Sequence, residues 1–258
     1  MKFTNMFYVT YRALQILYPK ALKKLSQVTE YTNISKDKNG IEIGGPSQIF
    51  SKEGILPLYD HALNIDGCNF SSETVWEGSV KKGQNYKYAS EKTGFQFISE
   101  ASDLSEIKDE QYDFLISSHC LEHCANPIKT LKEWIRVVKM NGHLLIVIPH
   151  KNGTFDNKRP VTSLEHMIHD YNDNTGEDDL THLEEILKLH DWSLDPYSGG
   201  IEKFKSRALK NLENRCLHQH VFNPTNLAEL INYTGLKIKR VDFKLPFHII
   251  LLAQKVIH

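Results

Sequence analysis

Histidine is concentrated in the second half of this 258-residue chain, where most of the thirteen histidines lie between His119 and His220. An imidazole gains and loses a proton near neutral pH, and its ring nitrogens bind transition metals. A group of histidines can therefore supply a general base or a metal site. This part of the sequence is the first candidate for catalytic chemistry.

Three pairs of residues in this region have a spacing that suits shared ligands. Residues four or three apart lie on one face of a helix, and residues two apart lie on one side of an extended segment. Such sets of histidine and carboxylate would bind Fe(II), Mn(II) or a similar divalent ion. The alternative is that they hydrogen-bond a substrate or nearby backbone groups. The candidate metal ligands are His166 and Asp170, four apart; His182 and Glu185, three apart; and His218 and His220, two apart.

A second group of candidate residues surrounds a glycine turn. Residues 42–47 read EIGGPS, where Gly44 and Gly45 permit a tight turn close to a ligand and Glu42 can hold that turn in shape. About twenty residues later, Asp66 closes the next apolar run and could accept both hydroxyls of a ribose. A dinucleotide site would require G-x-G-x-x-G, and Pro46 has no backbone N–H for a pyrophosphate. The pattern therefore favours a nucleoside site over an NAD site.

The elements that must position these residues alternate between strand and helix patterns. Short apolar runs separated by helical periodicity predict a mostly parallel sheet covered on both faces by helices. The last two runs are separated only by Pro246, which is too short for a parallel crossover, so they must form an antiparallel hairpin. The expected strands are residues 40–44, 62–66, 95–98, 112–118, 143–149, 235–245 and 247–256, and the clearest helices are 127–140 and 224–233.

The domain organisation follows from the same patterns. Residues 1–35 are expected to be an N-terminal helical segment, and residues 36–258 one α/β domain. Within that domain, residues 151–222 lose the strand pattern and predict a helical, histidine-rich insertion over the carboxyl edge of the sheet.

Composition excludes several functional classes. The 31 basic and 32 acidic residues nearly cancel, so no attraction to a nucleic acid polymer is expected. No apolar run approaches the roughly 20 residues that cross a bilayer, and residues 1–20 make a poor signal peptide. Four cysteines suit a reducing compartment, so we expect a cytoplasmic protein. Cys120 and Cys124 could contribute to a zinc site or be small buried thiols.

From about Gly40 onward the chain resembles a class I S-adenosylmethionine-dependent methyltransferase. The glycine turn is similar to a shortened motif I, residues 99–104 (SEASDL) to the adenine-reading stretch, residues 112–123 to motif IV, and residues 134–144 to the segment before strand five. The resemblance implies a Rossmann-like sheet and S-adenosylmethionine as cofactor. The cofactor-binding residues that it implies are Glu42, Gly44, Gly45, Asp66, Glu100, Ala101 and Ser117.

Two departures from the family pattern stand out. The glycine turn lacks its third glycine, which leaves open the contacts to the methionine end of the cofactor. Met140 and Asn141 replace the usual Pro-Gly before strand five, which we interpret as a turn variant.

Residues 149–222 are similar to a subgroup found beside glycosyltransferases in surface-polysaccharide pathways. The similarity implies methyl transfer to an oxygen of a small-molecule acceptor, a nucleotide-linked sugar or other glycan precursor, with Thr162 on the substrate side. Arg159, Lys151 and Lys158 form a basic group near the predicted pocket mouth and could hold a phosphate of such an acceptor; the alternative is an ordinary solvated loop. Two alternatives remain: a methyltransferase for a small phosphorylated or amino-acid-like metabolite, or an inactive binding protein. The N-terminal helices could support a homodimer.

Methyl transfer to a hydroxyl needs a base or a metal ion, because a neutral hydroxyl is a poor nucleophile. His119 follows the fourth strand, at the edge where the methyl group would be presented, and is the candidate base. The alternative is a loop histidine that hydrogen-bonds to the backbone. His166 and Asp170 are the other candidate catalytic residues, through a metal ion.

Overall fold

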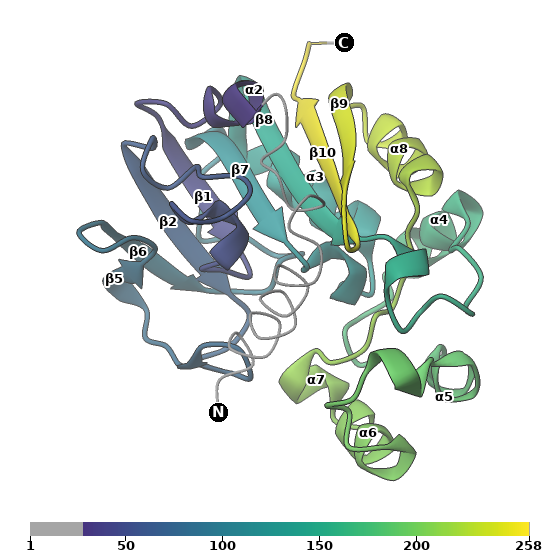
Figure 1. The fold of residues 1–258 in the computed structure, drawn as a ribbon. Helices are drawn as coiled ribbons and strands as arrows, with labels where there is room; N and C mark the ends of the chain where they lie inside the picture. The colour runs from purple at the N-terminus through teal and green to yellow at the C-terminus, as the bar shows by residue number, and fades with distance from the viewer. Residues whose placement is uncertain (1–27, 258) are drawn as a thin grey trace.

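The computed structural model describes residues 28–257, and its central feature is an eight-stranded sheet in the order β5-β6-β2-β1-β7-β8-β10-β9 (Figure 1). Strands β6, β2, β1, β7 and β8 pair in parallel, and β10 runs antiparallel to both β8 and β9. This confirms the predicted Rossmann-like sheet with its C-terminal hairpin. The strands are β1 (Asn39–Ile43), β2 (Asn64–Asn69), β5 (Gly83–Lys87), β6 (Thr93–Ile98), β7 (Tyr112–Ser118), β8 (Val138–Pro149), β9 (Lys237–Lys244) and β10 (His248–Gln254), with a separate small hairpin of β3 (Glu73–Thr74) and β4 (Gly78–Ser79).

Two strand boundaries differ from the prediction by three residues or more. Strand β2 does not end at Asp66 but continues to Asn69, because the polar Asp66 side chain is accommodated inside the sheet. Strand β8 begins at Val138 rather than residue 143, since α3 ends at Val137 and the chain pairs with Tyr112 at once. The prediction placed a strand end at the polar Asp66 inside β2, and it included the first residues of β8 in the helix 127–140, which in the structure ends at Val137.

The helices flank the sheet and fill the insertion. Helix α3 begins where the Asn126 side chain accepts a hydrogen bond from the backbone N–H of Lys129, and α8 begins with a capping box between Asn223 and Asn226. The α-helices are α2 (Val28–Thr32), α3 (Pro127–Val137), α4 (Leu164–Asn172), α5 (Leu183–Leu189), α6 (Ile201–Ala208), α7 (Asn211–Asn214) and α8 (Pro224–Tyr233). Short 3₁₀ turns cover Gln48–Phe50, Leu121–His123, Lys151–Gly153 and Trp192–Leu194.

The two faces of the sheet are covered differently. One face packs against α3, α4 and α8 around fully buried residues such as Leu131 and Trp134. In the described chain, the other face has only the 3₁₀ turn Gln48–Phe50 between β1 and β2, and the short helix α2 contributes Tyr31 to its core. That core also contains Phe50, Tyr59 and Tyr86, so helices cover this face less fully than the prediction implies. Residues 46–57 contain two prolines and a glycine, which disfavour a regular helix.

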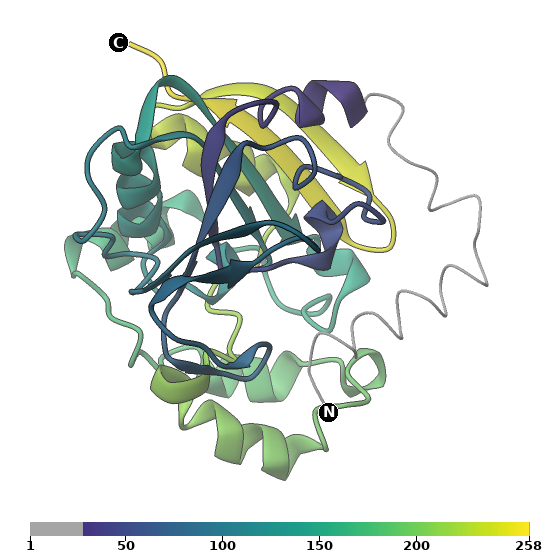
Figure 2. The same cartoon turned by 90° about the vertical axis from the view of Figure 1, so that its left-hand side faces the viewer.

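The insertion forms a small subdomain at one end of the sheet. Figures 1 and 2 both show helices α5, α6 and α7 grouped below the strands, away from the C-terminal hairpin. These helices share an apolar cluster of their own that includes Leu183, Phe204 and Leu217. The chain returns to the sheet where the Thr162 backbone N–H donates to the Val221 carbonyl and the Thr162 hydroxyl accepts the Val221 N–H. The predicted helical insertion is present.

The predicted N-terminal helices lie outside the described residues, apart from α2. Within residues 28–257, the structure contains no helix long and apolar enough to cross a membrane.

Candidate functional site

Glu42 holds the glycine turn from inside the protein. Its carboxylate is fully buried and accepts hydrogen bonds from the Tyr86 hydroxyl at 2.6 Å, the Tyr59 hydroxyl at 2.7 Å and the Ser47 backbone N–H at 3.0 Å. Burial raises the pKa of Glu42 to about 7, although these hydrogen bonds oppose the rise. The side chain therefore shapes the turn and has no surface for a ligand.

Gly44 is required by the conformation of that turn. Its φ is +83°, and a side chain there would bring a Cβ to 3.3 Å from Cβ of Cys120. The turn after β1 is thus pressed against the loop after β7, where Cys120 follows His119. The lack of a side chain at Gly44 leaves the backbone open at the sheet edge, which fits the close approach of a nucleoside cofactor.

Asp66 does not lie at the end of its strand. Its carboxylate accepts hydrogen bonds from the Phe95 backbone N–H at 2.8 Å and the Tyr112 hydroxyl at 2.8 Å, so it ties together strands of the sheet. The strand end carries Asn69, which the sequence reading missed. The Asn69 amide donates to the Gly45 carbonyl at 2.9 Å and accepts from the Trp76 indole at 3.1 Å. Only the correct length of β2 could have identified it.

Glu100, at the end of β6, meets an arginine from the insertion. Arg215 forms an ion pair with Glu100, and its guanidinium carbon lies 4.5 Å from the centre of the Phe70 ring. Arg215 Nε also lies 3.8 Å from the buried carboxylate of Glu177, whose pKa is raised to about 7 by burial. Arg215 therefore fastens the insertion to the strand end that carries Glu100. The adjacent carbonyl of Ala101 accepts the Trp134 indole N–H at 3.1 Å.

His119 stands at the end of β7 between two partners. Its Nδ1 lies 3.3 Å from the Glu122 carboxylate, and its Nε2 lies 3.0 Å from Nδ1 of His248. Burial lowers the pKa of His248 well below its usual value, so this ring is neutral. Burial would raise the pKa of Glu122, but the neighbouring histidines, with the His119 hydrogen bond foremost, lower it overall. Next to His119, the Ser117 hydroxyl is buried and donates to the Ile43 carbonyl at 3.1 Å.

A second histidine group lies beside Glu122. His123 Nε2 is 3.9 Å from the Glu122 carboxylate, and the His123 ring packs 4.6 Å from the ring of His218. Nδ1 of His218 contacts the Asp156 carboxylate at 2.6 Å. Burial would raise the pKa of Asp156, yet His218 and Arg159 lower it to about 2. This group combines a buried carboxylate with two imidazoles.

The sequence suggested that Arg159 lies near a pocket mouth, but the structure buries it. It is 1% exposed, and its guanidinium binds Asp156 at 2.9 Å, Glu185 at 2.9 Å and the carbonyl of His218 at 2.9 Å. A buried guanidinium is satisfied by partners inside the protein, so it is not available to a substrate phosphate. The Thr162 hydroxyl is likewise used internally, because it accepts the backbone N–H of Val221 at 2.9 Å.

The predicted metal ligands separate into two groups. His166 Nε2 lies 3.2 Å from His182 Nε2 and 3.3 Å from Asp170 Oδ2, and His220 Nε2 lies 3.8 Å from that same carboxylate oxygen. The other two predicted ligands are elsewhere. Glu185 turns to Arg159 instead of His182, and His218 belongs to the group around Glu122. The expectation that His218 and His220 act together is therefore wrong, because a polar chain with irregular backbone does not keep the two-residue alternation of a strand.

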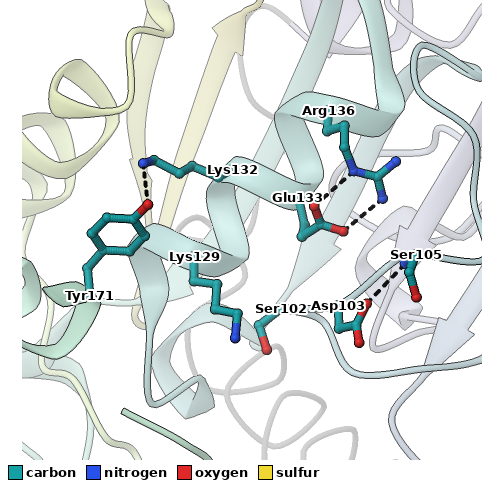
Figure 3. A pocket seen from close by; sticks show the side chains of 8 residues that line it. All are labelled: Ser102, Asp103, Ser105, Lys129, Lys132, Glu133, Arg136 and Tyr171. Carbon is teal, nitrogen blue, oxygen red and sulfur yellow. Dashed lines mark hydrogen bonds and ion pairs between the residues drawn. The ribbon is translucent and has the colours of Figure 1, made fainter. Parts of the chain in front are cut away.

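A surface hollow of about 410 Å³ lies away from these residues. Figure 3 shows it between α3 and the loop after β6. Its walls carry Lys132, which donates to the Tyr171 hydroxyl at 2.6 Å, and Arg136, which is paired with Glu133. None of the predicted site residues lines this hollow.

Comparisons with known proteins agree on one domain type. Residues 54–146 match the model of a family described as a methyltransferase domain. No curated protein matches the chain. Among solved structures, a putative S-adenosylmethionine-dependent methyltransferase from Listeria monocytogenes is 15% identical with a TM-score of 0.51, covering 92% of this chain and 98% of that one. A chain of the complex between the Haloferax volcanii Trm112 methyltransferase activator and the putative methyltransferase is 10% identical with a TM-score of 0.50, covering 95% and 93%.

The similarities to solved structures concern the fold alone, since the identities are low. The family match is a match of sequence, and it covers strands β2 to β7 and most of β8. Residues 54–146 therefore match the methyltransferase domain family, and the sheet has the fold of the S-adenosylmethionine-dependent methyltransferase structures that it resembles.

Proposed function

We propose that this protein transfers a methyl group from S-adenosylmethionine to a hydroxyl of a small polar acceptor, a nucleotide-linked sugar or another surface-glycan precursor. One observation carries the proposal. The Gly44 turn, which suits the cofactor, packs against Cys120, the residue after His119. A donor site and a candidate base therefore adjoin at the ends of β1 and β7, which are paired strands.

The cofactor, when bound, supplies an electrophilic methyl group on a sulfonium. The backbone at Gly44 and Gly45 would adjoin it, and the Asn69 amide is the polar side chain at the strand end where Asp66 had been expected. Glu100 and the backbone of Ala101 would border the adenine, as the sequence resemblance implies. Asn69 is buried and its amide is already bonded to Gly45 and Trp76, so it shapes the turn beside the cofactor and is not a direct ribose contact.

His119 would remove the acceptor proton. Glu122 keeps its negative charge beside His119 Nδ1, so it favours the ring orientation and the protonated form that follows proton transfer. Nε2 of His119 is hydrogen-bonded to neutral His248. The acceptor hydroxyl must therefore either displace His248 or transfer its proton to His119 through the His248 ring. In this pair His119 would be the base, and Glu122 would be the carboxylate that orients it.

The acceptor class is supported by the sequence resemblance of residues 149–222 and by the polar character of the insertion. Histidines and carboxylates line the segment by which the insertion returns to the sheet, near His123 and His220. Such side chains hydrogen-bond readily to an acceptor with many hydroxyls. Arg159 and Thr162 do not contribute to this support, because both are used inside the protein.

The test has two stages. Calorimetry with S-adenosylhomocysteine measures the cofactor site, and failure to bind at millimolar ligand would refute the methyltransferase proposal. Transfer of a labelled methyl group is then measured with nucleotide-diphosphate sugars, phosphorylated metabolites and amino acids as acceptors. Activity confined to the second or third panel would reject the sugar acceptor, and cofactor binding without transfer to any acceptor would indicate an inactive binding protein.

A further inference from the structure

We propose that His166, His182 and His220, together with Asp170, form a tetrahedral binding site for a zinc-like divalent ion that fastens the outer helices of the insertion to α4 and to the segment that returns to the sheet. The site is distinct from the His119 group. It does not depend on the proposed methyl transfer, because metal binding and its effect on stability can be measured without any reaction.

Three segments that are far apart in the sequence supply the four side chains. His166 and Asp170 lie on α4, one turn apart, and His182 immediately precedes α5. His220 lies on the segment that returns from the insertion towards α8. One nitrogen of each histidine lies within 4.8 Å of the others. An ion held by all of them would link the outer helices to the chain next to the sheet.

The separations match those of ligands around one small ion. Zinc holds nitrogen and oxygen ligands at about 2.0–2.1 Å, so neighbouring ligands at the corners of a tetrahedron are about 3.3 Å apart. His166 Nε2 lies 3.2 Å from His182 Nε2 and 3.3 Å from Asp170 Oδ2. A hydrogen bond between imidazoles could explain the first distance alone. It does not explain why the third imidazole, that of His220, also lies within 4.8 Å of both, or why the Asp170 carboxylate approaches His166 as well.

Two buried atoms in the group have no hydrogen-bond partner. They are Oδ2 of Asp170 and Nδ1 of His220, in residues that are 8% and 1% exposed. An unpaired buried polar atom costs free energy, and a bound ion would satisfy both. His220 also has the arrangement of a metal ligand, because its other nitrogen, Nε2, lies 3.2 Å from the Ala125 carbonyl. A ring oriented by a backbone carbonyl leaves one lone pair for the metal.

The group of Glu122, His123 and His218 is the internal comparison. There His123 Nε2 lies 3.9 Å from the Glu122 carboxylate, and Nδ1 of His218 already meets Asp156 at 2.6 Å. His218 therefore has a carboxylate partner of its own, whereas Nδ1 of His220 has no hydrogen-bond partner. The geometry therefore points to the four residues around His166.

The experiment uses the untagged full chain, stripped with a chelator and then titrated with Zn²⁺ against a chromophoric competitor. His182→Ala and Asp170→Asn test the site. His169→Ala is the matched control, since His169 is on the same helix but 74% exposed and paired with Asp173. We expect one equivalent of Zn²⁺ bound by wild type and H169A, a loss of affinity on the order of 100-fold or more in H182A, and about 10- to 100-fold in D170N.

Two further measurements guard against misfolding of a variant. Wild type loaded with Co²⁺ should show the intense visible bands of a tetrahedral site, and the melting temperature of wild type and H169A, but not of H182A, should rise with added Zn²⁺. The proposal is overturned if wild type binds no stoichiometric ion, if Co²⁺ gives no tetrahedral spectrum, or if binding survives in H182A and is lost in His123→Gln.

Discussion

At the scale of single residues, Glu42 is an acidic side chain that is fully buried in the fold. Three donors surround it, and Tyr59 and Tyr86 come from two separate segments that follow the turn in the sequence. The cost of burying its charge shows as a pKa of about 7, above the ordinary value of 4.5. Glu42 thus couples the shape of the cofactor turn to pH.

This coupling predicts a pH-dependent stability. Because the pKa of Glu42 is raised in the folded state, its contribution is fully present below pH 4.5 and is lost as the pH rises to about 7. The loss amounts to about 3 kcal/mol at most, from about 1.4 kcal/mol for each pKa unit. Glu42→Gln carries no titratable group and should lack this part of the pH dependence. Urea unfolding of both proteins at pH 5 and pH 8 measures the difference, and parallel curves would contradict it.

His119 allows a prediction about catalysis. Replacing His119 with alanine removes the proposed base and should lower kcat about 10²- to 10⁴-fold, while the affinity for S-adenosylhomocysteine stays near that of wild type. Glu122→Gln should also lower kcat, because it removes the charge that favours protonated His119. The exposed His169→Ala is the control. Equal loss of cofactor binding and turnover in H119A would instead indicate a structural role for the loop.

At the scale of elements, the insertion is attached to the sheet through a few buried charges. Arg215 is 7% exposed and joins α7 to Glu100, Glu177 and the Phe70 ring. It also donates to the carbonyls of Asn211 and Leu212 at the end of α7. One side chain thus holds both the end of a helix and its position on the sheet.

Removal of Arg215 should therefore loosen the insertion and leave the sheet intact. In Arg215→Ala, we expect faster amide hydrogen exchange across α6 and α7, because buried Glu177 loses its positive partner. Exchange in β7 and β8 should be unchanged. Lys205→Ala, which removes an exposed cation from α6, serves as the matched control. Uniform acceleration over the whole sheet would show that Arg215 supports global folding instead.

At the scale of the whole molecule, one sheet has two unlike covers. Helices α3, α4 and α8 fill one face, whereas the loop after β1, several tyrosines and the short helix α2 fill the other. Both covers contain side chains with no exposed area, such as Leu131 under the helices and Phe50 under the coil. Burial, rather than helical structure, is what makes each face a core.

Phe50→Ala should accordingly destabilise the protein as much as a substitution under a helix. We expect a loss of about 3–5 kcal/mol for F50A and about 2–5 kcal/mol for Leu131→Ala, each with one cooperative transition. Chemical denaturation followed by fluorescence and circular dichroism tests this. A much smaller effect of F50A would mean that the coil cover packs loosely.

Much of this architecture could be read from the chain itself. The alternating apolar runs, the short link at Pro246 and the glycine turn at Gly44 predicted the parallel sheet, the final hairpin and the sharp bend after β1. The i, i+4 spacing of His166 and Asp170 likewise predicted that they face each other on a helix. Each of these features depends on a few neighbouring residues, so local sequence is enough to specify it.

Partners and burial were decided only by the tertiary structure. The grouping of His182 with His166, and of His218 with Asp156, brings together residues from separate segments. The same is true of Arg159, which sequence placed at a pocket mouth and packing placed in the interior. The periodicity of a sequence pattern is local. The burial, charge state and ligands of a side chain depend on contacts with residues that lie tens of positions away in the sequence. The sequence by itself therefore determined the sheet and the region of chemistry, and the fold decided which histidines can share a proton or an ion.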